Sequence, residues 1–246
     1  IDRSLVGSEM CIRDRKGKAV HLGERDCSLQ RRHQKVLEET PSPGATPDEV
    51  KKIGKICSDA VSKMKYEGAG TIEFLYENKE FFFIEMNTRL QVEHPITEAV
   101  FGIDLVKEQI RVASGMDMSL SQETLKPQGH AIECRIIAER LPSFSPSPGN
   151  INEFHSPGGI GIRMDSAIYN GFKVPPFYDS LIGKLIVHAD SRSLALSRLS
   201  RALDELIIDG VHTTMDLFKE IIDEEDFKSG EYNIHWLEHW LSDKVQ

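Results

Sequence analysis

Hydrophobic residues recur with helical spacing in four stretches of the chain. The run Thr46-Pro47-Asp48-Glu49 combines an N-cap threonine, a proline at the first helical position and the glutamate of a capping box. It predicts a helix over about 46–64. The same periodicity predicts helices over about 102–113, 191–208 and 214–224.

Alternating or continuously apolar runs predict the strands. Residues 71–76 and 81–87 are rich in β-formers and are separated by Glu77-Asn78-Lys79-Glu80, a pattern typical of a hairpin. Further strands are expected over 130–138 and 181–187. Polar, turn-prone residues over about 119–129 predict a boundary between two parts of the chain.

The N-terminal segment shows no clear periodicity. Residues 4 to about 14 (SLVGSEMCIRD) resemble translated sequencing-adapter peptides, and they lack the apolar core of a secretory signal. We therefore expect residues 1–15 to be a non-native leader that takes no part in the fold.

Composition narrows the class of protein. Hydrophobic residues make up 39% and charged residues 28%, as in ordinary globular proteins. The net charge of −9 argues against a nucleic-acid partner. No apolar run approaches the roughly 20 residues of a membrane span, so no membrane partner is expected. The four scattered cysteines favour reduced thiols and a cytoplasmic protein.

Two carboxylates lie on the strands of the expected hairpin. If residues 78–80 form a three-residue loop, Glu73 and Glu85 lie directly opposite, and such like charges destabilise a sheet unless a cation separates them. A divalent cation would resolve the conflict, with Asn87 as a neutral oxygen ligand. A two-residue loop would set Glu73 against Ile84 and favour the alternative, a solvated hairpin face.

The period of two continues beyond Asn87. In an extended chain, Arg89, Gln91 and Glu93 project to the same side as Glu85, and the run from Glu85 to Glu93 would span about 26 Å. That length suits a site with metal and phosphate at one end and a second substrate at the other. Arg89 and Gln91 offer donors for an oxyanion such as bicarbonate, and Glu93 is a candidate base. The alternative is an edge strand whose charges face water.

Positive charge is concentrated at two further places. Residues 30–35 (QRRHQK) could steer an anionic substrate into a cleft, or form a solvated turn balanced by Glu38 and Glu39. Arg135 lies in an otherwise apolar strand with Glu133, where an arginine is costly to bury unless it is paired or serves a ligand. A structural ion pair is the more frequent explanation.

Seven motifs follow one another along the chain: ERDCSLQRRHQK (24–35), GTIEF (70–74), FIEMNTRLQVEHP (83–95), GHAIECR (129–135), PSPG (146–149), YDSLIGK (178–184) and ELIIDG (205–210). Together they resemble the biotin carboxylase family of the ATP-grasp superfamily, from about residue 14 to about residue 241. The resemblance implies an α+β fold. Residues 16–126 would form the C-terminal part of an ATP-grasp domain, an antiparallel sheet with helices, and residues 127–246 a biotin carboxylase C-terminal domain.

The resemblance also implies a reaction, the ATP- and bicarbonate-dependent carboxylation of biotin on a carrier protein. Glu73, Glu85 and Asn87 would bind the Mg²⁺ or Mn²⁺ ions that hold ATP, with His33 near the nucleotide.

Bicarbonate would be held by Lys35, Arg89, Gln91 and Val92, and Glu93 would deprotonate it for attack on the γ-phosphate. The carboxyphosphate so formed would break down to carbon dioxide and phosphate beside biotin. Arg135 would stabilise the biotin enolate, as positioned cations stabilise developing charge.

The chain departs from this family in several places. The nucleotide-fold domain and glycine-rich lid of complete members do not precede residue 14, so we expect a truncated fragment that is inactive alone. Ile137 stands where asparagine is common, Arg140 where an acidic residue is common, and Ile160 where bacterial members have an aromatic residue near their dimer contact. Arg163, near the same contact, is retained.

The leading hypothesis is the biotin carboxylase subunit of acetyl-CoA carboxylase, acting in fatty acid synthesis. Its expected partners are the biotin carboxyl carrier protein and the carboxyltransferase subunits, with a homodimer in the full-length protein. One alternative is the same module in a longer acyl-CoA or pyruvate carboxylase. Another is a fragment that binds without catalysing.

Overall fold

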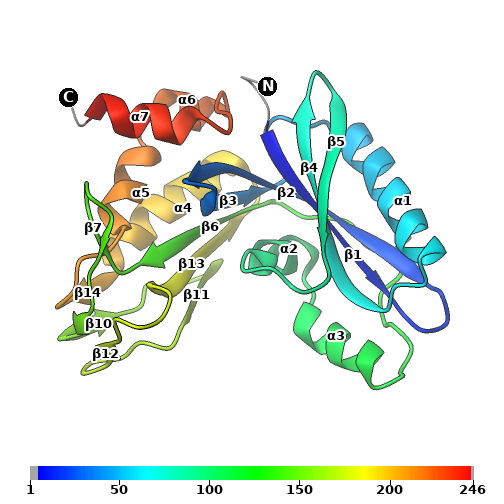
Figure 1. The fold of residues 1–246 in the computed structure, drawn as a ribbon, viewed down its shortest axis with the longest axis horizontal. Helices are drawn as coiled ribbons and strands as arrows, with labels where there is room; N and C mark the ends of the chain where they lie inside the picture. The colour runs from blue at the N-terminus through cyan, green and yellow to red at the C-terminus, as the bar shows by residue number, and fades with distance from the viewer. Residues whose placement is uncertain (1–4, 245–246) are drawn as a thin grey trace.

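An antiparallel sheet of eight strands runs through the molecule (Figure 1). The computed structural model describes residues 5–244. In spatial order the strands are β11 (Ile162–Ser166), β13 (Leu181–Ala189), β6 (His130–Ile137), β3 (Gln34–Thr40), β2 (Ala19–Arg31), β1 (Leu5–Arg13), β4 (Gly68–Glu77) and β5 (Glu80–Asn87). With the helices packed on it, this sheet confirms the α+β fold class.

Seven helices and three small sheets complete the described part of the chain. The helices are α1 (Pro47–Lys63), α2 (His94–Phe101), α3 (Leu105–Ala113), α4 (Arg192–Glu205), α5 (Met215–Ile221), α6 (Glu225–Ser229) and α7 (Trp236–Lys244). The small sheets pair β7 (Glu139–Arg140) with β8 (Ser145–Pro146), β12 (Lys173–Val174) with β9 (Gly149–Asn150), and β10 (Glu153–His155) with β14 (Ile207–Asp209).

Helix α1 forms where its capping sequence predicts it. The Thr46 hydroxyl accepts a hydrogen bond from the Glu49 backbone N–H, and the Glu49 carboxylate accepts one from the Thr46 N–H at 2.9 Å. Both donors would otherwise be unsatisfied at the helix start. The apolar stripe of α1, which includes Cys57 and Val61, packs against Cys11, Ile72 and Phe74 of the sheet.

The N-terminal segment contradicts one expectation. Residues 5–13 are not outside the fold, because they form β1 in the interior of the sheet, paired with β2 on one side and β4 on the other. Met10, Cys11 and Ile12 are all buried, Cys11 toward α1 and the other two on the opposite face. A strand covered on both faces shows no polar–apolar alternation, which is why no strand was expected there. Its non-native origin stays a prediction.

The segment after β5 is also more helical than expected. The helix predicted over about 102–113 is α3, which begins at Leu105 with Asp104 as its N-cap. Gly102 instead ends the preceding helix α2, where its positive φ of 65° suits a glycine. Helix α2 itself was not predicted.

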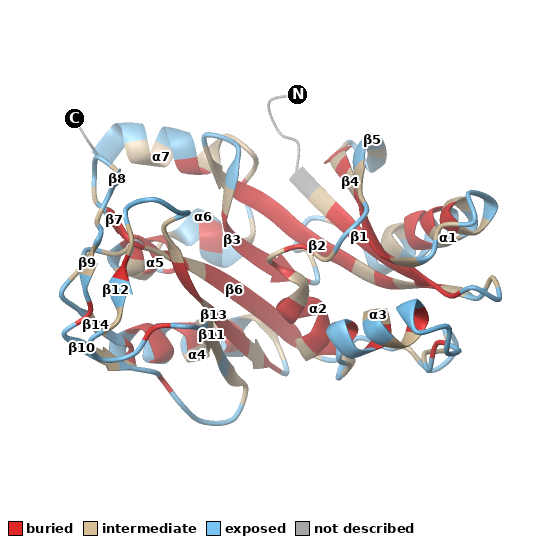
Figure 2. Ribbon diagram, turned by 60° about the horizontal axis from the view of Figure 1, so that its bottom comes forward, coloured by how far each residue is buried: buried red, intermediate tan, exposed pale blue. Residues whose placement is uncertain are grey.

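The two faces of β6 and β13 carry different helices. Ile132, Cys134 and Leu185 pack into the core that holds α4, whereas Ala131 and Ile186 pack with α2. Because successive side chains of a strand alternate between faces, α2 and α4 lie on opposite sides of these strands. Figure 2 shows the buried residues of β6 and β13 between the two layers.

The sheet is continuous across the polar stretch 119–129, since β6 pairs with β3 directly. The division of the chain between residues 126 and 127 therefore stays a prediction. Among residues 5–244, no helix has both the length and the apolar character that crossing a membrane requires.

Candidate active site

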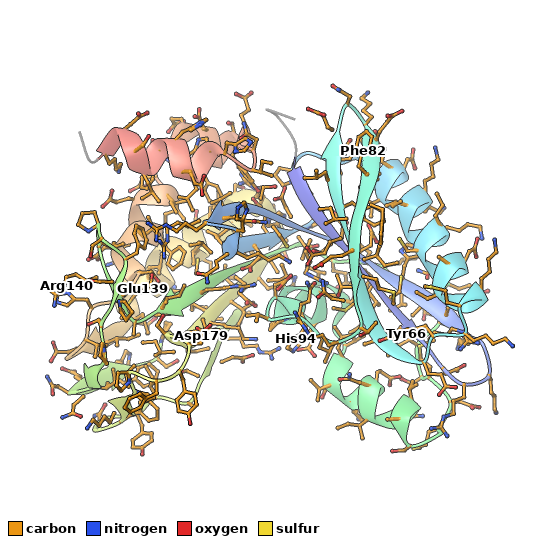
Figure 3. All side chains as sticks on the ribbon, in the orientation of Figure 1. Tyr66, Phe82, His94, Glu139, Arg140 and Asp179 are labelled. Carbon is orange, nitrogen blue, oxygen red and sulfur yellow. The ribbon has the colours of Figure 1, made fainter. Side chains whose placement is uncertain are left out.

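A cleft of about 360 Å³ lies on the α2 side of the sheet. The structure brings together in its lining every residue that the sequence proposed for catalysis, binding or metal ligation: His33, Lys35, Glu73, Glu85, Asn87, Arg89, Gln91, Val92, Glu93 and Arg135. Asp179, which also lines the cleft, lies beside the strands of the C-terminal half, and His94 lies at the centre of the molecule (Figure 3).

The two hairpin carboxylates face each other through an irregular register. Glu77 pairs with Glu80, so the turn is the two-residue loop Asn78-Lys79, both with positive φ. Such a loop alone would set Glu73 against Ile84. A β-bulge between Glu73 and Phe74 adds one residue to β5, however, and places Glu73 opposite Glu85. The predicted opposition is therefore present, although by a different route from the three-residue loop.

Neutral amides and one lysine surround this carboxylate pair. Glu73 Oε1 accepts hydrogen bonds from Lys35 Nζ at 2.8 Å, from Asn87 Nδ2 at 3.3 Å and from the Gln91 amide. Asn87 Nδ2 also donates to Glu85 Oε1 at 2.9 Å. These donors offset the like charges, and the oxygens of Glu73, Glu85 and Asn87 form the hard donor set that Mg²⁺ or Mn²⁺ prefers.

Within residues 5–244, no group of three or more histidine, cysteine, aspartate or glutamate side chains forms a metal site. A divalent cation here would thus rely on the amide oxygen of Asn87 and on ligands from outside the chain.

The polar run does not continue as an extended strand. Strand β5 ends at Asn87, and the chain turns through residues 88–92 into α2, with Glu93 as the N-cap residue and Pro95 in the first turn. The two ends of the run therefore do not lie at opposite ends of a long site. Glu73 and Glu93 are close enough to share one cation, because Lys35 Nζ lies 2.8 Å from Glu73 Oε1 and 2.7 Å from Glu93 Oε1. The residues of the run share one cleft because the chain bends.

Glu93 is the most completely enclosed charge of the cleft, with its side chain 1% exposed. Lys35 Nζ contacts Oε1, and Arg135 Nη2 contacts Oε2 at 2.9 Å. Burial opposes its charge, but the cations Arg25, Lys35 and Arg135 outweigh that effect and lower the pKa of Glu93 to about 2. Without substrates, Glu93 is therefore an ionised carboxylate held between two cations.

Three residues that support the cleft were not singled out from the sequence. Arg25 on β2 is completely buried and donates to the Gln91 side-chain oxygen at 3.0 Å, which fixes the orientation of that amide. Lys184 on β13 donates to the Val92 carbonyl at 2.9 Å. Glu38 on β3 is the third. Arg25 and Lys184 lie within the motifs 24–35 and 178–184, and Glu38 was considered only as a counter-charge of the basic turn, so no local pattern indicated what these three residues contact.

Arg135 is paired differently from the sequence interpretation. Its guanidinium forms ion pairs with Glu38 and Glu93, and Glu133, which lies on the same strand, makes no hydrogen bond within the described chain. Burial opposes the charge of Arg135, but the carboxylates of Glu38 and Glu93 raise its pKa. Arg135 therefore forms ion pairs, as the structural interpretation expects, and it also lines the cleft, so its role toward a ligand stays a prediction.

The basic turn also differs from its simpler interpretation. Arg32 and His33 form the two-residue turn between β2 and β3, and His33 lines the cleft. Glu38 and Glu39 do not balance this turn, since both are completely buried farther along β3. Arg31 pairs instead with Glu139 at 3.3 Å.

Comparison with known proteins gives the family. The model of the carbamoyl-phosphate synthase L chain ATP-binding domain matches residues 7–121, and that of the biotin carboxylase C-terminal domain matches residues 133–239. A biotin carboxylase of Haemophilus influenzae is 56% identical over 94% of the chain. The chain belongs to the biotin carboxylase family.

Members with different carboxylation targets are among the relatives. One of the pyruvate carboxylase subunits of Methanothermobacter thermautotrophicus is 52% identical over 92% of this chain and 46% of its own length. The biotin carboxylase domain of the Hydrogenobacter thermophilus 2-oxoglutarate carboxylase, solved as a dimer with MgADP, ADP and bicarbonate, superposes with a TM-score of 0.95. It is 43% identical over 97% of this chain and 53% of its own. The chain spans about half the length of the curated relatives it matches, 51% of the Haemophilus protein.

Proposed function

We propose that the protein to which this chain belongs carries out the ATP- and bicarbonate-dependent carboxylation of biotin held on a carrier protein. The observation that carries this proposal is Glu93, a buried carboxylate held between Lys35 and Arg135 at the centre of a cleft that also contains the oxygen donors Glu73, Glu85 and Asn87. A reaction between two anionic substrates needs cations to offset their charge and a base to take a proton, and this cleft contains both.

Mg²⁺ or Mn²⁺ would be held by Glu73, Glu85 and Asn87, and it would offset the phosphate charge of ATP. His33, at the edge of the same cleft, would lie near the nucleotide. Because Glu73 also accepts from Lys35 and Gln91, a metal here would share its ligand with the groups proposed for the second substrate.

Lys35, Arg89, Gln91 and Val92 would hold bicarbonate, and Glu93 would take its proton. A base with a pKa of about 2 is a weak acceptor at neutral pH. Substrate anions that draw Lys35 and Arg135 into new contacts would raise that pKa, so Glu93 would become an effective base only in the loaded site. Arg135 would then be available for the enolate of biotin.

The wider role that we propose is the biotin carboxylase subunit of acetyl-CoA carboxylase, acting in fatty acid synthesis in the cytoplasm. It would work with the biotin carboxyl carrier protein and carboxyltransferase subunits. A homodimer of the full-length protein would have Arg163 near its contact, where the exposed Ile160 departs from the aromatic residue of bacterial members. A second candidate is the same module of a longer acyl-CoA or pyruvate carboxylase, which the similarity to a pyruvate carboxylase subunit favours.

The test uses Arg135→Ala in the full-length parent protein. We expect carboxylation of biotin to fall by roughly 100-fold or more, because a cation that stabilises developing charge is lost, while the bicarbonate-dependent ATPase is partly retained. The matched control is Arg140→Ala, an exposed arginine at the outer edge of the C-terminal half (Figure 3), which should leave both activities unchanged. Equal loss of both activities would contradict the role of Arg135.

A fragment that binds without catalysing is the remaining candidate for Ile1–Gln246 alone. We expect the isolated chain to show no ATP-dependent carboxylation of biotin. Measurable turnover by the pure chain would refute that expectation.

A further inference from the structure

Two carboxyl groups lie side by side behind the wall of the cleft. Glu38 of β3 and Glu133 of β6 are direct partners across the sheet, and both are completely buried. Two charged carboxylates in this arrangement would destabilise the sheet strongly, since like charges directly opposite repel and burial removes the water that would screen them. The native sheet can therefore hold this pair only if one of the two groups is neutral.

The cation nearest to this pair is Arg135, two residues from Glu133 on the same strand. Its Nη2 forms an ion pair with Glu38 Oε1 and lies 2.9 Å from Glu93 Oε2. The guanidinium thus lies between a carboxylate in the cleft and a carboxylate behind it. Arg135 Nε and the carboxylate oxygens of both Glu133 and Glu38 make no regular hydrogen bond within the described chain, so what distinguishes Glu38 from Glu133 is its ion pair with Arg135.

The other groups that face the pair do not neutralise it. They are Lys35 on β3, Cys27 on β2, Lys184 on β13 and Glu93 at the start of α2, whereas the neighbouring Cys134 of β6 points to the α4 face. Lys35 is occupied by Glu73 and Glu93, and Lys184 donates to the Val92 carbonyl. Burial, and then the neighbouring Glu38, raises the pKa of Glu133 well above its ordinary value, and Arg135 forms its ion pair with Glu38, so Glu133 is the member of the pair that more readily holds a proton.

We propose that Glu38 is a positioning residue for Arg135: its buried carboxylate holds the guanidinium against the rear of the cleft, and loss of that negative charge releases Arg135 toward Glu93 and the substrates. Glu133 supports this arrangement by remaining uncharged, which leaves Glu38 as the carboxylate that pairs with Arg135 from behind. The role of this contact in biotin carboxylation rests on the proposed function, whereas the positioning of Arg135 by Glu38 does not.

This arrangement has a consequence for the reaction. When Glu93 takes a proton it no longer attracts Arg135, and the guanidinium is then shared only between Glu38 and the reacting groups. Burial raises the pKa of Glu38 to about 7, with Glu93 adding to the effect and Arg135 and Lys35 opposing it. The strength of the rear contact should therefore change across neutral pH.

The experiment follows the Arg135 guanidinium by NMR in the ligand-free chain, labelled with ¹³C,¹⁵N-arginine, between about pH 5 and 9. We expect its signal to move with a midpoint near pH 7, set by Glu38. Glu38→Gln should abolish the midpoint and leave the signal at its low-pH position, and Glu38→Asp should restore a midpoint. The matched control is Glu205→Gln on the surface of α4, whose partner is Arg201, and it should not alter the Arg135 titration.

An Arg135 signal that does not titrate in the unaltered chain would overturn the proposal, and so would a midpoint that survives in Glu38→Gln. If Glu38→Gln does not fold, ¹³C-glutamate labelling of Arg135→Gln gives a second test. The Glu38 midpoint should then rise by about one pH unit or more, because its cation is gone, and an unchanged midpoint would refute the proposal. The measurement needs no substrate, so it stands or falls independently of biotin carboxylation.

Discussion

Glu38 and Glu39 are neighbours on β3, both are completely buried, and they lie on opposite faces of the sheet. Glu39 faces the core with α4, where both of its oxygens have partners. Arg192 donates to Oε1 at 3.0 Å and to Oε2 at 2.7 Å, His130 Nε2 lies 2.6 Å from Oε2, and the Tyr232 hydroxyl donates to Oε1 at 2.5 Å. Glu38 faces the cleft and has the shared guanidinium of Arg135.

Equal burial thus gives opposite results. Burial alone would raise the pKa of both groups, but the hydrogen bonds and charges of His130 and Arg192 lower the pKa of Glu39 to about 2. The pKa of Glu38 rises to about 7, because burial, with Glu93 adding to it, outweighs the cations Arg135 and Lys35. The face that packs on α4 satisfies its charges fully, and the face that forms the cleft leaves them able to change.

The largest effect is expected from Glu39→Gln. The substitution leaves the Arg192 guanidinium buried without its carboxylate and weakens the contacts of His130 and Tyr232. We expect the free energy of unfolding at pH 7 to fall by about 3–5 kcal/mol, the usual cost of breaking a buried pair from one side. Urea denaturation measures it. If Glu39→Gln lowers the free energy of unfolding no more than Glu38→Gln does, the α4 face and the cleft face of β3 do not differ as described.

The pH dependence of stability sharpens the comparison. The pKa of Glu39 is about 2 in the folded chain, against 4.5 for an ordinary glutamate. Its stabilisation is therefore complete above about pH 4.5 and is lost as the pH falls toward 2, by about 3 kcal/mol in all. Unfolding curves of the native chain and of Glu39→Gln over this range should converge as the pH falls. Parallel curves would contradict the assignment.

The smallest effect is expected from Glu38→Gln. At pH 5 both the glutamate and the glutamine are neutral, so the free energy of unfolding should change by no more than about 1 kcal/mol. Because the pKa of Glu38 is raised and that of Glu39 is lowered, their contributions to stability depend on pH in opposite directions. The contribution of Glu38 is complete below pH 4.5 and is lost as the pH rises through 7. The variant should therefore gain stability relative to the native chain above pH 7. A relative loss there would mean that charged Glu38 stabilises the fold.

Local signals in the sequence predicted the local structure well. The capping box marked the start of α1, and β-formers on both sides of a turn marked the hairpin of β4 and β5. Strand β1 was missed because burial on both faces removes alternation, and α2 was missed because the period of two was carried through the turn after Asn87, up to the N-cap residue Glu93. Both errors arise where tertiary packing, rather than local pattern, decides the conformation.

The sequence predicted which residues line the cleft, but not the contacts that hold them in place. The family motifs named the residues that line the cleft, because those residues lie within continuous stretches of sequence. Each of the three supporting residues has a partner that is distant in the sequence. Arg25 contacts Gln91, Glu38 contacts Arg135, and Lys184 contacts Val92. Nothing local distinguishes the buried Glu38 from a surface charge, so its pairing had to come from the order of strands in the sheet.

The bulge at Ile84 makes the hairpin sensitive to its residue count. Between the turn and the cleft, β5 carries one residue more than β4, and this odd residue is what turns Glu85 and Asn87 to the side of Glu73. Most substitutions at Ile84 would leave the number of residues in β5 unchanged. Deletion of Ile84, in contrast, would turn the side chains that follow it, including Glu85 and Asn87, to the opposite face of the sheet. Length variation among relatives should therefore be found at the hairpin tip in steps of two, and not between Ile84 and the cleft.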